Sequence, residues 1–95
     1  MTKENILKYL SAHKEEFKEK FGVVNIGLFG SYARGDANEN SDVDIVIEMK
    51  PKSLVNRLKL KEELASNLNL DIDIGYFSSL RHFIQNEIRN EIIYV

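Results

Sequence analysis

Gly30-Ser31-Tyr32-Ala33-Arg34-Gly35 is followed, after a short turn-forming segment, by Ser41-Asp42-Val43-Asp44-Ile45-Val46. The first block comes directly after residues 23–29, a run of apolar and β-branched side chains typical of a buried strand. The second block opens an alternation of polar and apolar side chains over residues 42–48, which predicts another strand. Two strands joined by a polar loop favour antiparallel pairing.

Paired aspartates mark two of the expected strands. Asp42 and Asp44 are two residues apart, so both side chains leave the same face of a strand. A third strand, expected over residues 71–77, repeats the pattern with Asp71 and Asp73. Aspartate is disfavoured in strands, and clustered carboxylates repel each other unless a cation lies between them. An isolated Asp-x-Asp is usually a polar strand end, but this repetition favours a site for a hard cation such as Mg²⁺ or Mn²⁺.

Helical periodicity surrounds these strands. Thr2 and Gly22 are expected to cap a helix over residues 3–21. Ser53 is expected to begin a second helix over residues 54–67, with an apolar side formed by Leu54, Leu58, Leu64 and Leu68. Ser78 or Ser79 would cap a last helix that carries Leu80, Phe83, Ile84 and Ile88 on one side.

The resulting element order is α-β-β-α-β-α, an α/β (α+β) fold with helices packed on a small mixed sheet. The helix between the second and third strands favours their parallel pairing. The 95 residues predict a single domain over 1–95. The absence of cysteine excludes disulfides, and a net charge of −2 argues against nucleic-acid or anionic-membrane binding. No apolar run approaches a membrane span, so we expect no membrane partner and a cytoplasmic location.

Three familiar motifs do not match the sequence. Gly30 and Gly35 have P-loop spacing, but Asp36-Ala37 stands where Lys-Ser/Thr is required. The loop from Asp36 has Ser41 and Ile47 where an EF-hand requires glycine and glutamate. No Gly-x-Gly-x-x-Gly fingerprint is present. Gly-Ser by itself is an ordinary turn, although its backbone N–H groups and the Ser31 hydroxyl suit phosphate oxygens.

The two quoted blocks together resemble the signature of the DNA polymerase β-like nucleotidyltransferase superfamily. That signature is Gly-Ser, ten residues and Asp-x-Asp, with Ala-Arg-Gly after the serine and a serine before the first aspartate. The likeness is greatest to its minimal nucleotidyltransferases (MNT), stand-alone domains of about this length. Asp73-Ile74, Leu80 and the ending Glu91 to Val95 resemble the family's third-carboxylate strand and final helix.

The resemblance implies roles for individual residues. Gly30 and Ser31 would hold the triphosphate of a nucleotide, and Asp42 and Asp44 would bind divalent metal. Asp73 would complete the metal site and help to deprotonate the attacking hydroxyl, whereas Asp71 has no counterpart in the family. Arg34 would either touch phosphate or pair with an acidic side chain and brace the loop.

The resemblance also implies a function. Minimal nucleotidyltransferases typically act as antitoxins that transfer AMP from ATP to a tyrosine of a cognate HEPN-type RNase toxin. The expected partners are therefore ATP, Mg²⁺ (or Mn²⁺) and a HEPN toxin in a hetero-oligomer. Two alternatives remain. One is a non-catalytic, nucleotide-binding antitoxin that masks its partner stoichiometrically. The other is a transferase for a small molecule such as an aminoglycoside, against which the lack of room for an acceptor-binding domain argues.

Overall fold

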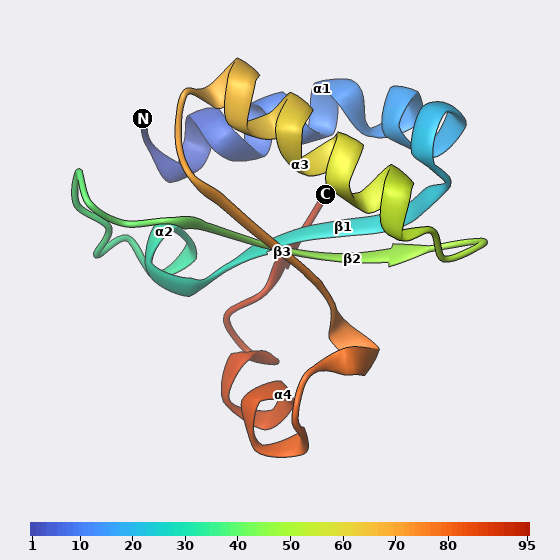
Figure 1. Cartoon of the computed structure of the whole chain (residues 1–95). Coiled ribbons are helices and arrows are strands. Elements are labelled where there is room, and N and C mark those ends of the chain that lie inside the picture. Colours follow the sequence, from blue (N-terminus) through green and yellow to red (C-terminus); the bar gives the residue numbers. More distant parts are fainter.

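A four-stranded sheet forms the centre of the computed structural model, which describes residues 1–95 (Figure 1). Its strands are β1 (Val23–Phe29), β2 (Val43–Met49), β3 (Ile72–Tyr76) and β4 (Ile93–Tyr94), in the order β3-β2-β1-β4. β1 pairs antiparallel with both β2 and β4, and β2 pairs parallel with β3. The predicted mixed sheet is therefore confirmed.

Helices cover both faces of this sheet. α1 (Lys3–Phe21) and α3 (Leu54–Leu68) lie side by side on one face, and α4 (His82–Ile88) lies on the other (Figure 1). Lys20 and Glu63 form an ion pair at 2.6 Å between α1 and α3, and the Asn67 amide donates to the Tyr9 hydroxyl at 2.8 Å. The buried side chains are all apolar. None of the helices has the length and apolar character needed to cross a membrane.

The predicted ends of the first two long helices are confirmed. The Thr2 hydroxyl accepts a hydrogen bond from the Asn5 amide at 3.2 Å, and Ser53 accepts one from Asn56 at 3.1 Å. Gly22 ends α1 in the left-handed conformation, with φ of 77°, and its amide donates to the Lys18 carbonyl. These bonds satisfy backbone groups that a helix end otherwise leaves unpaired.

The predicted apolar side of α3 is partly wrong. Leu54 and Leu58 are 60% and 49% exposed, whereas the side chains that face the core are Leu60, Leu64 and Leu68. Leucines at four-residue intervals share one side of a helix, and Leu60 begins that series. Leu54 and Leu58 lie on another side, which the first turns of α3 leave in solvent.

The last third of the chain also departs from the prediction. Neither Ser78 nor Ser79 caps α4, because both lie in a short 3₁₀ helix, η1 (Phe77–Ser79), and Arg81 precedes α4 without a side-chain capping bond. Phe83 is 59% exposed, and only Ile88 of α4 is buried. The tail after Glu91 is the strand β4 and not a helix.

Candidate functional site

Strand ends bring the predicted site residues to one end of the sheet. In the register of the sheet, Asp44 lies opposite Phe29 of β1 and beside Asp73 of β3. Because β2 and β3 start at the end where the antiparallel β1 finishes, the Gly30 turn and the aspartates meet there. We call Asp42, Asp44 and Asp73 the site carboxylates.

Gly30 lies very close to Asp44, the site carboxylate that belongs to β2. Its φ is 77°, and an added Cβ would overlap Oδ2 of Asp44 and stand 2.9 Å from Asp44 Cγ. Only glycine provides both this conformation and this space. The local fold therefore ties the backbone of the Gly-Ser pair to the position of the Asp44 carboxylate.

The Gly-Ser pair opens a one-turn helix, α2 (Gly30–Arg34), inside the segment that was expected to be a loop. Ser31 is half-buried in its first turn, and Tyr32 and Ala33 are buried beneath it. Gly35 ends α2 with φ of 87°, and its amide donates to the Ser31 carbonyl at 2.9 Å. The position of Ser31 is therefore set by a short helix packed on the core.

Arg34 pairs with acidic side chains, which is one of its two predicted roles. Its Nε lies 3.2 Å from Asp36 Oδ2, and its Nη1 lies 3.4 Å from both carboxylate oxygens of Glu91. The Arg34 side chain is half exposed, so these ion pairs contribute little free energy on their own. Their effect is to orient the guanidinium beside the Gly30 turn.

The surroundings of Asp44 raise the pKa of its carboxyl group. Burial raises its pKa, and the negative charges of Asp73 and Asp42 raise it further. The Arg34 guanidinium opposes this rise, while Glu91 adds to it. A carboxylate that is both desolvated and surrounded by other carboxylates would be stabilised by a cation.

The donor chemistry of the site carboxylates fits a hard divalent cation such as Mg²⁺. Asp73 and Asp42 lie close enough to Asp44 for their charges to raise its pKa. Asp42 and Asp73 are exposed, and no three acidic or histidine side chains converge into a preformed metal-binding group. Asp71 is exposed too, and its carbonyl accepts a hydrogen bond from the Val43 amide at 2.9 Å.

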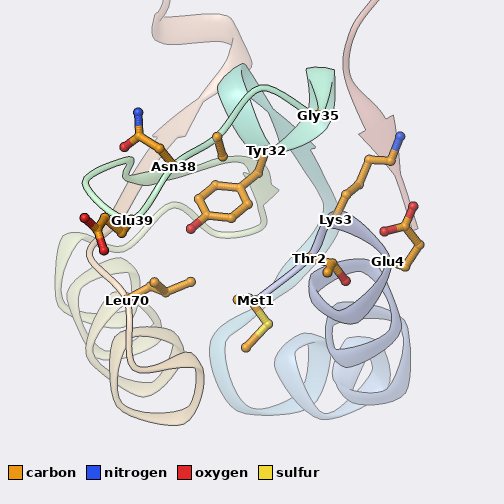
Figure 2. Close-up of a pocket in the computed structure, with 10 residues that line it drawn as sticks. Met1, Thr2, Lys3, Glu4, Tyr32, Gly35, Asn38, Glu39 and Leu70 are labelled. Carbon is orange, nitrogen blue, oxygen red and sulfur yellow. The ribbon is translucent and has the colours of Figure 1, made fainter.

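A separate hollow of about 720 Å³ lies between the start of α1 and the loop after α2. Figure 2 shows Tyr32 pointing into it, with Met1 and Leu70 on the opposite side. None of the predicted site residues lines this hollow. The predicted site residues therefore lie outside this hollow, at the end of the sheet.

Glu91 belongs to the site and was missed in the sequence. Its Oε1 accepts a hydrogen bond from the Gly30 amide at 3.0 Å, in addition to the contacts with Arg34. The Gly30 N–H is therefore already bonded to Glu91 and is not free to bind phosphate. This differs from the expectation that the backbone N–H groups of the Gly-Ser pair would hold phosphate oxygens. The run Ile92-Ile93-Tyr94-Val95 was the available signal, because a β-rich segment there predicts an edge strand that carries Glu91 to the sheet.

Comparison with known sequences supports a single family. The family model of the nucleotidyltransferase domain matches residues 10–95. The protein adenylyltransferase MntA of Thermococcus cleftensis is 44% identical over 96 residues, covering 100% of this chain and 97% of that protein. A candidate protein adenylyltransferase of Methanocaldococcus jannaschii is 35% identical, covering 99% of this chain and 98% of that protein.

Solved structures agree with this grouping. A structure described as a candidate minimal nucleotidyltransferase has a TM-score of 0.82 and 28% identity, covering 98% of this chain and 95% of that one. A crystal structure of a toxin–antitoxin with AMP-PNP has a TM-score of 0.62 and 28% identity, covering 88% of this chain and 64% of that one. The chain is therefore a nucleotidyltransferase and belongs, with the minimal nucleotidyltransferases, to the nucleotidyltransferase domain family.

Proposed function

We propose that this chain is a Mg²⁺-dependent protein adenylyltransferase that acts as an antitoxin. It would transfer AMP from ATP to a tyrosine of a cognate HEPN-type RNase toxin and thereby neutralise the toxin. The observation that carries the proposal is the close approach of Gly30 to Asp44 together with the pairing of Asp44 with Asp73 in the register of β2 and β3. The relative named a protein adenylyltransferase and the toxin–antitoxin structure with AMP-PNP support the choice of donor and partner.

We assign the two sides of the reaction to two parts of the site. Ser31 and Arg34 are assigned to the triphosphate, with Gly30 shaping the turn that presents them. Asp42, Asp44 and Asp73 would hold Mg²⁺ or Mn²⁺, which supplies charge neutralisation on the phosphates and lowers the pKa of the attacking hydroxyl. In such a transfer the protein mainly positions the reactants.

The transfer is an in-line displacement at the α-phosphorus. The tyrosine oxygen forms a bond to that phosphorus, the bond to the bridging oxygen breaks, and diphosphate leaves. We assign the tyrosine proton to Asp73, whose side chain is exposed at the sheet end and so accessible to a macromolecular acceptor. We place the reaction in the cytoplasm, where ATP and Mg²⁺ are available.

Catalysis and masking differ in stoichiometry, which gives a decisive experiment. A small amount of this chain, with ATP and Mg²⁺, should inactivate a large excess of a cognate HEPN toxin. The toxin should stay inactive after this chain is removed and should carry one or more AMP groups on tyrosine by mass spectrometry. Protection only at a one-to-one ratio or above, without added mass, would replace the catalytic proposal with stoichiometric masking.

Matched aspartate variants test the site within the same experiment. Asp44→Asn should abolish transfer, because the change removes the charge of the central site carboxylate. Asp71→Asn should transfer normally, because Asp71 is exposed and contributes only its backbone carbonyl to β2. Equal loss in both variants would mean that the strand end needs aspartates for folding and not for chemistry.

A further inference from the structure

Glu91 reaches the nucleotide end of the site from the far end of the chain. Its Oε1 accepts the Gly30 amide hydrogen at 3.0 Å, and both of its oxygens lie 3.4 Å from Arg34 Nη1. The Glu91 side chain is only 21% exposed. A single carboxylate thus holds the first residue of α2 and the last one together.

The sheet itself delivers Glu91 to this position. β4 pairs antiparallel with β1 through Leu28 with Ile93 and Gly27 with Tyr94. Continuing this register by two residues places Glu91 opposite Gly30. The Glu91 side chain therefore takes the place that the next ladder hydrogen bond would occupy, and the edge strand determines where its carboxylate lies.

Glu91 is not one of the site carboxylates, because it lies next to β4, on the other side of β1 from β2. It approaches Gly30 from the β4 side, whereas Asp44 approaches Gly30 from the β2 side, on the opposite side of β1. The Gly30 amide is thus used for support, which leaves Ser31 and Arg34 to face the nucleotide.

We infer that Glu91 is a positioning residue for nucleotide binding, which sets the Gly30 turn and orients Arg34 through its two contacts. The inference rests on the proposed function. Gly30 also lies against Asp44. If the Gly30 turn lost its bond to Glu91, the distance between this turn and the site carboxylates would therefore no longer be fixed. The expected effect is on the affinity for nucleotide, with a smaller effect on folding.

The experiment uses two readouts on the full chain. The first is hydrogen exchange of the Gly30 amide by NMR, which needs no nucleotide. The second is the Kd of α,β-methylene-ATP, measured in the presence of Mg²⁺. This analogue cannot be cleaved between the α- and β-phosphates. Glu91→Ala should speed the exchange of the Gly30 amide and raise the Kd of the analogue about tenfold. A tenfold change is the effect expected from losing a charge-assisted hydrogen bond.

Three further variants separate the contacts. Glu91→Gln keeps an acceptor for the Gly30 amide, so exchange should stay slow while affinity falls partway. Asp36→Asn removes the other acidic partner of Arg34 without touching Gly30, and should leave Gly30 exchange unchanged. Glu87→Gln, an exposed change of the same kind on α4, should alter neither readout.

The outcomes are distinguishable. Unchanged Gly30 exchange in Glu91→Ala overturns the anchoring contact, and faster exchange with unchanged affinity overturns its role in binding. Tighter binding of the analogue in Glu91→Ala would show that Glu91 competes with phosphate, which also overturns the inference. Failure of the unmodified chain to bind the analogue would reject the proposed function, and with it this inference, whatever the Gly30 exchange shows.

Discussion

Gly30 meets two constraints that can be separated by experiment. Gly30 and Gly35 both have positive φ, 77° and 87°, but an added Cβ at Gly35 has nothing within 4 Å, while one at Gly30 overlaps the Asp44 carboxylate. The two glycines therefore form a matched pair at the two ends of α2. Backbone conformation is common to both, and only Gly30 adds the contact with the site.

Gly35→Ala should lower the free energy of unfolding by about 1–2 kcal/mol, the usual cost of a left-handed conformation for an alanine. Gly30→Ala should lower the free energy of unfolding by the same amount and by about 1–3 kcal/mol more, because the Asp44 side chain must move to make room for the Cβ. Urea denaturation measures both. If the two variants lose the same stability, Asp44 is not held against Gly30 in solution.

Asp44 makes the stability of the chain depend on pH in a defined direction. Burial and the neighbouring Asp73 and Asp42 raise its pKa above the ordinary aspartate value of about 3.9. The folded state then binds the proton more tightly than the unfolded state. The contribution of Asp44 to stability is therefore greatest below the ordinary pKa and is lost as pH rises through the raised one.

Asp44→Asn should accordingly be more stable than the unmodified chain at pH 7, and this advantage should vanish as pH falls below about 4. The measurement is the free energy of unfolding of both proteins across that range. Asp71→Asn serves as the control, because Asp71 is exposed and does not perturb Asp44. An Asp44→Asn variant that is less stable at pH 7 would contradict the predicted repulsion.

Among the elements, β4 is the shortest strand and the one that carries Glu91 to the site. An added Cβ at Gly27 would stand 2.9 Å from Ile92 Cγ2 and 3.0 Å from Tyr94 Cδ1, so β4 lies directly against this glycine. An added Cβ at Gly75 of β3 would meet nothing within 4 Å. The two strand glycines therefore test the packing of β4 separately from the effect of glycine on a strand.

Gly27→Ala should destabilise the chain by about 1–3 kcal/mol and expose the C-terminal segment to proteases. Gly75→Ala should stabilise it by about 0.4–1 kcal/mol, since alanine lowers the entropy of the unfolded chain without a clash. Denaturant midpoints and limited proteolysis report the two effects. Resistance of the segment in Gly27→Ala equal to that of the unmodified chain would mean that β4 tolerates displacement.

Long, periodic elements could be predicted from the sequence, and short ones could not. α1, with its caps Thr2 and Gly22, and the three longer strands follow local patterns that tertiary packing did not override. α2 begins at a glycine and is a single turn, so no periodicity marks it. β4 has two residues, and its pairing with β1 depends on contacts distant in sequence.

The same distinction applies to the candidate site. The Asp42 and Asp44 pair and its proximity to Asp73 follow from strand periodicity and the parallel pairing of β2 with β3. Glu91 could not be placed, because its partner Gly30 is known only once the register of β4 is known. The prediction that Leu54 and Leu58 belong to the apolar side of α3 is wrong for a related reason. The side of α3 that is buried depends on how the helix packs on the sheet, and not on the spacing of its leucines alone.

For the whole molecule, ligand binding should be visible as added stability. ATP with Mg²⁺ that binds only the folded state contributes about 2.7 kcal/mol at 100 times its Kd, which corresponds to roughly 10–20 °C in Tm for a domain of this size. Calorimetry should show this rise for the unmodified chain and not for Asp44→Asn. A similar rise in Asp44→Asn would place the nucleotide away from the site carboxylates.

The bond between Gly30 and Glu91 joins residues 61 positions apart, and this has a consequence for biosynthesis. A ribosome makes β1, β2 and β3, with every site carboxylate, before it makes Glu91. The nascent domain therefore acquires its aspartates early and the anchor of its nucleotide turn late. Glu91 is thus the last of these residues to be synthesised, and we expect nucleotide capture to follow the synthesis of β4.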